Sequence, residues 1–571
     1  MAVFFNGRLF VSPATMSVVD DSALANQNLS VGNTVALIGP SVGGQPNTAL
    51  RFGSPSEAIS ALRGGDLLTA VLKAFDPSAQ TNGPSTVVAV RVNPATRSTL
   101  TLLDQASNDA IHLESTDYGA YTNQIKVKVE SGTNSGKKVT TQFDNDFFAQ
   151  DDIARRAFMI RYSGQQLSAT MTVTDNQIIL QAPSGNMVDT IDLSIYRTVL
   201  QVVDRINAVS GFSASVLDGN GGRTALNGLD FVNSVDVHSG DYIVRADLQA
   251  VIDWMNDTAE GYVNATRAAG AGDPPANIGF AYMSGASDGV VTNSEWSNAY
   301  TTLQTEDVQW VCPVTGNPAV HAMNDAHCAF MSTVARAERR GIVGTSLGTS
   351  DTDAIQAARN LASDRTSLIH IGFYDYDASG RLALHPPYIL AALIAGAFSG
   401  VNPGTSLTNK SIKVRGLERN LRNPTDTDLL IQGGVFCIES TSAGYKVVKS
   451  ITTWLANSNF NRVEVSAGAA VDFVSRSVRT AVDVLRGEKS AQTTMARAAS
   501  ITDSVLRELA RPEPQGPGVI VGNTDNPAYK NISVSVNGDV LRIEFQCSPV
   551  IPVNYIPVSI FAQPFSGSVS V

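Results

Sequence analysis

The sequence has few charged residues and no excess of basic ones. Asp, Glu, Lys and Arg together make up 16% of the 571 residues, and the formal net charge is −11. Proteins that bind nucleic acids neutralise phosphate groups with basic patches. This composition therefore argues against a nucleic-acid-binding protein, and we expect no nucleic acid among the partners.

Cysteine is also scarce, and its spacing suits neither a disulfide framework nor a zinc site. The four cysteines are Cys312, Cys328, Cys437 and Cys547, and none forms a CxxC pair. His321 and His327 lie near the first two, but a structural zinc site needs closely spaced ligand pairs at both ends. We expect unpaired core thiols, folding in a reducing compartment, and neither a metal nor a cofactor.

Long hydrophobic runs are missing as well. The apolar stretch Tyr388–Phe398 has eleven residues, whereas a membrane-spanning helix needs about 20. The first residues lack a basic region followed by a long apolar one, so we expect no signal peptide and no membrane insertion. Pro386 and Pro387 suit a helix start, and a helix that is apolar on every side is a buried one. Its predicted core residues are Tyr388, Leu390, Leu393, Ile394 and Phe398.

The order of strand and helix patterns predicts a multi-domain α/β protein with an inserted β-rich module. An apolar strand at Thr34–Ile38, a helix at Ser54–Phe75 and a second strand at Val87–Val92 begin the α/β core. The predicted divisions are an N-terminal arm (1–30), the first part of the core (31–100), the inserted module (101–225), the remaining core (226–510) and a C-terminal hairpin with an arm (511–571).

Alternating apolar and polar residues mark the inserted module as a half-buried antiparallel sheet. Ile125–Glu130 and Leu167–Thr174 both alternate in this way, and a helix is predicted at Ile195–Val209. Near the C-terminus, two amphipathic helices are predicted at Val471–Leu485 and Gln492–Leu509. They precede a hairpin at 532–545, whose predicted turn is Asn537-Gly538.

The sequence offers weak support for catalysis. Ser346 lies in a GxSxG pattern, and Asp375 and His385 follow in the order found in hydrolases, so an α/β hydrolase using Ser346 is one alternative. However, the next helix is predicted to begin several residues after this serine, and short Gly and Ser patterns arise by chance in a chain with 46 glycines. We expect a protein that is not an enzyme.

Five segments, in order along the chain, resemble the sheath proteins of contractile phage tails and related contractile injection systems. They comprise a strand, Gly-Pro turn and helix (33–62), an apolar strand ending in an Arg-containing run (87–92), a Gly-aromatic-Asn segment (116–129), a Gly- and Asp-containing segment before a helix (283–296), and a Pro-led apolar helix with a polar loop (385–414).

This resemblance implies an α/β core with an outward inserted domain and two arms that add strands to neighbouring subunits. It implies a structural and mechanical subunit that assembles as helical, sixfold stacked rings around a tail tube and contracts to drive the tube through the host envelope. The implied partners are copies of itself, the tail tube protein, and baseplate and tail terminator proteins. The implied location is the virion tail, assembled in the host bacterial cytoplasm. Another virion structural protein, such as a capsid or tube subunit, is the second alternative.

The resemblance also suggests contact residues. In this family, helices near the C-terminal end build the inner surface, so their basic residues are candidates for tube contacts, with a solvated helix face as the alternative for each. These candidates are Arg476, Arg479, Arg486, Lys489 and Arg497. The candidates for contacts between subunits through the arms are Phe4, Phe5, Leu9, Phe10, Val11, Tyr555, Ile556, Val558, Ile560 and Val569.

Overall fold

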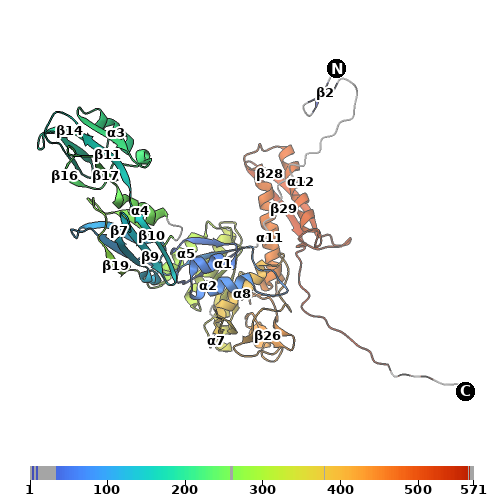
Figure 1. The fold of residues 1–571 in the computed structure, drawn as a ribbon. Helices are drawn as coiled ribbons and strands as arrows, with labels where there is room; N and C mark the ends of the chain where they lie inside the picture. Colours follow the sequence, from blue (N-terminus) through green and yellow to red (C-terminus); the bar gives the residue numbers. More distant parts are fainter. Residues whose placement is uncertain are drawn as a thin grey trace. The chain divides into compact units, whose positions relative to one another are not determined.

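The computed structural model describes residues 3–5, 8–10, 34–257, 261–377, 380–563, 565 and 567. The chain divides into two units, and the second is inserted in the sequence of the first (Figure 1). Unit 1 comprises residues 1–41, 47–92 and 292–571, and unit 2 comprises residues 42–46 and 93–291. Each unit mixes strands with helices, so the protein is of the α/β type.

A six-stranded sheet forms the centre of unit 1. Its first five strands run parallel, and the edge strand β4 is antiparallel to β5. In sheet order the strands are β22 (Thr366–Ile369), β21 (Arg340–Gly344), β20 (Trp310–Pro313), β3 (Thr34–Gly39), β5 (Thr86–Arg91) and β4 (Ala49–Phe52). The central strands are buried almost completely, as expected for parallel strands covered on both faces.

Helices connect these strands and pack on the sheet. They are α1 (Pro55–Leu62), α2 (Gly65–Phe75), α5 (Asn293–Leu303), α6 (Pro318–Thr333), α7 (Asp351–Leu361) and α8 (Pro387–Ser399). Helices α2 and α8 pack against each other and against the sheet, and α5 and α6 form a second pair. The capping residue Ser54 accepts a hydrogen bond from Glu57 N and so begins α1 where the sequence predicts it, but the single helix predicted at Ser54–Phe75 is divided into α1 and α2 at Arg63 and Gly64.

Helix α8 is the buried apolar helix that the sequence predicts. Leu390, Leu393 and Ile394 have no exposed surface, and the Phe398 ring stacks on Trp310 with 4.8 Å between ring centroids. A Cβ atom at Gly396 would collide with the Ala74 carbonyl oxygen of α2, so glycine permits the close approach of the two helices. Tyr388 is half-buried and donates a hydrogen bond from its hydroxyl to Asp66 at 2.8 Å.

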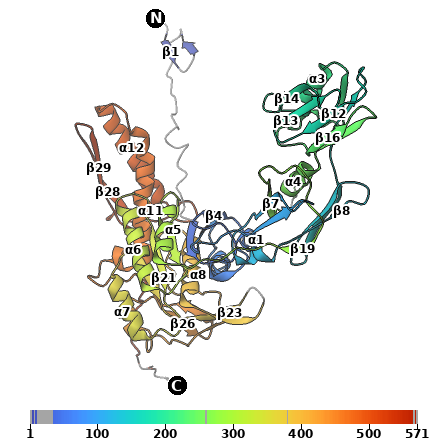
Figure 2. The ribbon, with the colours of Figure 1, turned by 90° about the vertical axis from the view of Figure 1, so that its left-hand side faces the viewer.

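The remaining elements of unit 1 are small antiparallel sheets beside α8 and, towards the C-terminus, a helix pair with a hairpin (Figure 2). Small antiparallel sheets come from β23 (Phe373–Tyr376), β24 (Leu382–His385), β25 (Gly416–Leu417), β26 (Ile438–Thr441) and β27 (Gly444–Val447). The helices are α9 (Asp428–Gln432), α10 (Phe460–Val463), α11 (Val465–Val482), the 3-10 turn η3 (Asp483–Leu485) and α12 (Gln492–Leu509), and the hairpin is β28 (Tyr529–Asn537) with β29 (Val540–Cys547).

Unit 2 contains two hydrophobic cores. The first lies among β6 (Thr99–Leu103), β7 (Asp109–Ser115), η1 (Ala120–Gln124), β8 (Lys126–Ser131), β9 (Lys137–Phe143), β10 (Asp146–Ile153), α4 (Asp247–Asp257), β18 (Val263–Arg267) and β19 (Ile278–Tyr282). The second lies among β11 (Arg156–Tyr162), β12 (Thr170–Val173), β13 (Gln177–Gln181), β14 (Met187–Asp192), α3 (Val199–Asn207), β15 (Phe212–Val216), η2 (Asn220–Gly222), β16 (Val232–Asp236) and β17 (Tyr242–Arg245).

Unit 2 extends beyond the predicted module of residues 101–225. The reason is strand pairing, because β16 pairs with β12, β17 with β11, β18 with β7 and β19 with β8. Residues 226–291 therefore complete the sheets of the insertion, and the return to unit 1 comes at Thr292. The local alternation of each strand is visible in the sequence, but the identity of its partner strand is not.

Three predicted boundaries are wrong by a few residues. The hairpin turn consists of Gly538 and Asp539, because Asn537 pairs with Val540 as the last cross-strand pair. Helix α11 begins at Val465 rather than Val471. The first residues of this helix are small and pack closely, since a Cβ atom at Gly468 would collide with the Arg340 guanidinium. Helix α3 begins later than predicted, after a capping box formed by its N-cap threonine and a glutamine.

Candidate assembly surfaces

The C-terminal arm is anchored to unit 1 at its root. Asn554 Nδ2 donates a hydrogen bond to Glu464 Oε2 at 3.3 Å. Lys449 Nζ lies 3.4 Å from the Tyr555 hydroxyl oxygen and 5.5 Å from the centre of its ring, a cation–π distance. We call Lys449, Glu464, Asn554 and Tyr555 the arm clasp. A groove of about 610 Å³ lies beside it, between residues 454–463 and 551–555.

Glu464 is the unusual member of the clasp because it is a buried carboxylate. It is 1% exposed, and its Oε1 accepts hydrogen bonds from Ser406 Oγ at 3.2 Å and Ser466 Oγ at 3.4 Å. Burial raises the pKa of Glu464 to about 7, although hydrogen bonds from Asn554 and Ser406 and the charge of Lys449 act in the opposite direction. Glu464 is not among the residues predicted from the sequence. The one local sign of its burial is its position as a lone carboxylate between two valines.

From Tyr555 onward, the arm carries several large apolar side chains that are exposed to water. Tyr555 is 76% exposed, Ile556 79%, Val558 74% and Ile560 85%. These four belong to the predicted contacts between subunits, and Val569 lies outside the described residues. An exposed apolar patch of this kind marks an interaction site.

The N-terminal candidates lie in a short antiparallel hairpin of β1 (Val3–Phe5) and β2 (Arg8–Phe10). Phe4 stands opposite Leu9, Phe5 opposite Arg8, and Phe10 opposite Val3. Val11 lies outside the described residues. An isolated two-stranded hairpin is marginal in water, so a sheet or surface that covers it would stabilise it.

The C-terminal hairpin β28–β29 has one apolar face and one polar face. Val534, Leu541 and Ile543 pack with residues of α12 such as Ile501. The alternate positions, among them Ser533, are exposed. Within the part of the chain that the structure describes, this sheet has two strands, so each of its long edges presents unpaired backbone groups. Such edges accept strands from other chains.

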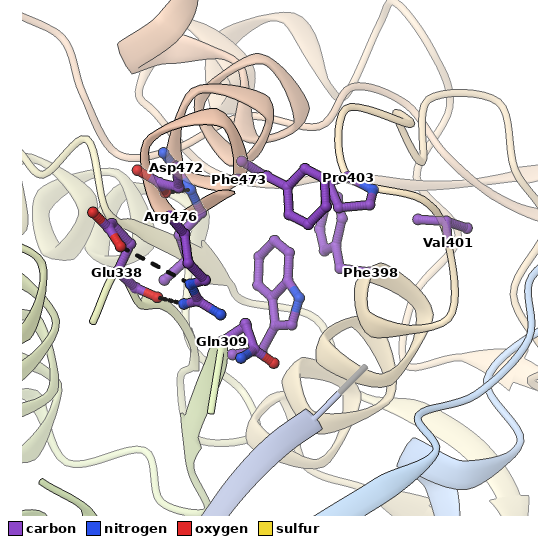
Figure 3. Close-up of a pocket in the computed structure, with 11 residues that line it drawn as sticks. Gln309, Glu338, Phe398, Val401, Pro403, Asp472, Phe473 and Arg476 are labelled. Atoms are coloured by element: carbon purple, nitrogen blue, oxygen red, sulfur yellow. Dashed lines mark hydrogen bonds and ion pairs between the residues drawn. The ribbon is translucent and has the colours of Figure 1, made fainter. Parts of the chain in front are cut away.

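Two of the predicted tube-contact residues hold α11 to the core. Arg476 Nη2 donates to the Glu338 carbonyl oxygen at 2.7 Å, beside a cavity of about 50 Å³ (Figure 3). Arg479 Nη2 lies 2.5 Å from Glu338 Oε1. The Arg476 side chain is 15% exposed and that of Arg479 is 37% exposed. The cavity is too small for a ligand and is closed by packing between α11 and the residues around Trp310.

The other three basic candidates are more accessible. Arg486 is 80% exposed and pairs with Asp483 in the preceding turn. Lys489 is exposed. Arg497 is 49% exposed and pairs with Glu488 at 2.6 Å. Their ion pairs are solvated, so these charges remain available to a partner at small cost.

The residues of the hydrolase alternative, Ser346, Asp375 and His385, do not form a catalytic triad in the structure. Ser346 is exposed in the loop after β21, and α7 begins five residues later at Asp351 rather than at the serine. Asp375 pairs with Lys73 at 2.5 Å, and the His385 ring lies 5.2 Å from that of Phe373. Among the described residues, no hydrogen bond joins Ser346 to either partner that a triad would need.

The described residues form neither a metal site nor a membrane-spanning helix. Across the ranges that the structure describes, no three His, Cys, Asp or Glu side chains gather closely enough to hold a metal ion. The same ranges contain no helix with the length and apolar character needed to cross a membrane.

Comparisons with known proteins point to one family. Residues 289–453 match the family model of the phage tail sheath protein central domain. The tail sheath protein of Bacillus phage SP01 is 28% identical over 588 residues, covering 99% of this chain and 98% of that protein.

Solved structures share the fold across almost the whole chain. The sheath tail protein of Listeria innocua matches with a TM-score of 0.56 at 14% identity, covering 93% of this chain and 95% of that one. The sheath tail protein of Desulfitobacterium hafniense matches with a TM-score of 0.55 at 13% identity, covering 95% and 96%. Residues 289–453 therefore correspond to the central domain of phage tail sheath proteins, and the chain as a whole resembles tail sheath proteins, the structural subunits of a sheath, in sequence and in fold.

Proposed function

We propose that the chain assembles with copies of itself into a helical sheath around a tail tube and contracts to drive the tube through the host envelope. The observation that carries this proposal is the C-terminal arm. It is anchored at the clasp, and from Ile556 onward its apolar side chains are exposed. A second copy of the chain offers the surface that would cover them.

The arms provide the links between subunits in this proposal. Each arm leaves its own subunit and adds a strand to a sheet of a neighbour, and the open edges of hairpin β28–β29 are suitable acceptors. A contact between two different surfaces of identical subunits is heterologous, and repeating it without closure produces a helical assembly. We expect this assembly to take the form of sixfold stacked rings.

Contraction then moves whole subunits rather than refolding them. The parallel sheet and α8 form a tightly packed core, and packed cores resist continuous deformation. Beyond the clasp, the described part of the arm has no secondary structure of its own, so it acts as a hinge that keeps neighbours linked while the bodies rotate and move outward. No chemical step is required of the chain, and its function is mechanical.

Contacts with the tube are proposed to be electrostatic and weak. Arg486, Lys489 and Arg497 supply exposed positive charge near the C-terminal helices. Exposed ion pairs contribute about 0–1 kcal/mol each, so many of them position a sheath on a tube and still release it during contraction. The remaining proposed partners are baseplate and tail terminator proteins, and the proposed site of assembly is the host bacterial cytoplasm, before the tail joins the virion.

Electron microscopy of the purified protein tests the proposal. The full chain is expected to form striated hollow tubes or rings, and a chain ending at Tyr555 is expected to remain dispersed with an unchanged circular dichroism spectrum. Tubes formed equally well by both would refute the role of the arm. Ser346→Ala serves as the matched control, and it should leave assembly unchanged.

A further inference from the structure

The spacing of prolines in the C-terminal arm gives its backbone two unequal edges. In a strand, the N–H and C=O groups of one residue point to the same edge, and successive residues alternate between the two edges. Between residues 553 and 563 the chain contains a single proline, Pro557. Proline has no N–H to donate to a ladder. The edge formed by even-numbered residues therefore keeps all its donors, whereas the odd-numbered edge lacks the donor of residue 557.

The side chains of the same segment also divide by parity. The even-numbered residues Ile556, Val558 and Ile560 are apolar and 74–85% exposed. Between them stand Pro557 and Ser559, which are exposed as well. Successive side chains of a strand point to opposite faces, so the segment would have one continuous apolar face and one face carrying Pro and Ser. The structure shows it without secondary structure of its own (Figure 1).

Hairpin β28–β29 has the complementary pattern. Its inner face carries Val534, Leu541 and Ile543 against α12, and its outer face carries polar residues such as Ser533 and Ser535. A strand added to this hairpin would need apolar residues at alternate positions facing inward and small or polar residues facing outward. Residues 556–560 meet both requirements.

The clasp defines where such a strand begins. Asn554 and Tyr555 are bound to Glu464 and Lys449 of their own subunit. The segment free to pair with another chain therefore starts at Ile556.

We propose that residues 556–560 form a one-edged strand, which pairs through its even-numbered residues with an open edge of hairpin β28–β29 in a second copy of this chain. This inference rests on the proposed exchange of arms. Because the odd-numbered edge lacks a donor at Pro557, the arm can only be the outermost strand of the shared sheet. Pro557 thereby ends the sheet and blocks edge-to-edge growth, a common protection of strand edges.

A proline scan of the arm tests this parity in the full-length chain. Val558→Pro removes a donor from the pairing edge, and Ser559→Pro removes one from the edge that already lacks a donor. We expect Val558→Pro to raise the protein concentration needed for assembly about tenfold or more, since ladder hydrogen bonds are lost. Ser559→Pro should stay within about twofold of the unaltered chain, because proline is tolerated on an outer edge.

Val558→Ala separates loss of the side chain from loss of the donor, because it shortens the apolar face and keeps the N–H. The protein concentration that Val558→Ala needs for assembly should lie between those of the two proline variants. Assembly is measured by sedimentation and electron microscopy, and circular dichroism of the unassembled protein checks the fold. Equal effects of Val558→Pro and Ser559→Pro, or a larger effect of Ser559→Pro, would overturn the one-edged strand.

Assembly of the chain ending at Tyr555 distinguishes failure of the one-edged strand from failure of the arm exchange. If that truncation abolishes assembly while the scan shows no parity, the arm is exchanged but does not pair through one edge. If the truncated chain assembles normally, the exchange itself is wrong, and the one-edged strand fails with it.

Discussion

Helix α8 and the C-terminal arm are both rich in large apolar residues, but those of α8 are buried and those of the arm are exposed. Leu390, Leu393 and Ile394 of α8 have no exposed surface, whereas Ile556 and Ile560 of the arm are 79% and 85% exposed. An apolar segment that finds its cover within the chain becomes core. An apolar segment that finds no such cover is suited to be covered by another chain, and we propose that for the arm this other chain is a second copy.

The largest expected effect is on the buried side of this comparison. Leu393→Ala in α8 should lower the free energy of unfolding by about 2–5 kcal/mol, because it leaves a cavity in a packed core. Chemical denaturation of the unassembled protein measures the loss. The matched control is Ile560→Ala, which should change this free energy by less than about 0.5 kcal/mol, as for other exposed positions. A destabilisation of similar size in both variants would contradict the contrast.

The second prediction concerns the arm, where a substitution should impair assembly and leave the stability of the subunit unchanged. The double substitution of Ile556 and Val558 by serine should abolish assembly or raise the concentration it requires by at least about tenfold, because two apolar side chains are lost from the interface. Thermal unfolding of the unassembled protein should not change. The control is Leu429→Ser, an exposed apolar position of α9 that is 74% exposed. Its assembly should match that of the unaltered chain, and equal losses in both would argue against a specific arm.

The third prediction separates basic residues that hold the fold from those available to a tube. Arg479→Ala should cost about 1.5–3 kcal/mol of stability, because its partner Glu338 is 6% exposed and loses a charged hydrogen bond. Reversing Arg486, Lys489 and Arg497 to glutamate should leave stability nearly unchanged and weaken co-sedimentation with tail tubes, most strongly at low salt. Tube binding that is insensitive to this triple reversal would contradict the proposed contacts.

The smallest expected effect concerns the pH dependence of the clasp. Burial raises the pKa of Glu464 from its ordinary 4.5 to about 7, so the folded chain, in which this carboxyl is buried, favours its neutral form, although the hydrogen bond from Asn554 acts in the opposite direction. The stabilisation is therefore complete below about pH 4.5 and is lost as the pH rises through 7. Lys449 is the charged group that opposes this trend by favouring the carboxylate.

Chymotrypsin cleavage after Tyr555 measures how often the root opens. The ratio of cleavage rates between the unaltered chain and Glu464→Gln, which stays neutral, should rise severalfold from pH 6 to pH 8.5. Comparing the two chains at each pH removes the pH dependence of the protease. A ratio that stays constant would show that Glu464 does not control the clasp.

Local patterns made much of the fold predictable. The eleven-residue apolar run defines α8, and alternation defines strands such as β8 and β12. The mixed α/β class and the resemblance to tail sheath proteins also follow from the sequence. What could not be predicted was set by contacts between distant segments. Strands β18 and β19 pair with strands that lie more than a hundred residues earlier, and nothing local in them identifies those partner strands.

The contact surfaces were less predictable than the fold. Basic residues on an amphipathic helix look alike in sequence, but Arg476 is held by a backbone carbonyl group while Arg486 lies in solvent. The clasp joins Glu464 to Asn554 across 90 positions, and single polar residues give no sign of such a pairing. The arm itself was predicted, because its apolar residues are interrupted by prolines and cannot build a core.

Cryo-electron microscopy of the assembled full-length protein would test the central claim most directly. We predict continuous density for residues 556–560 along an edge strand of hairpin β28–β29 in a second copy, with Asn554 still bound to Glu464 of its own subunit. Density in which these residues fold back on their own subunit, or contact no other copy, would contradict the account.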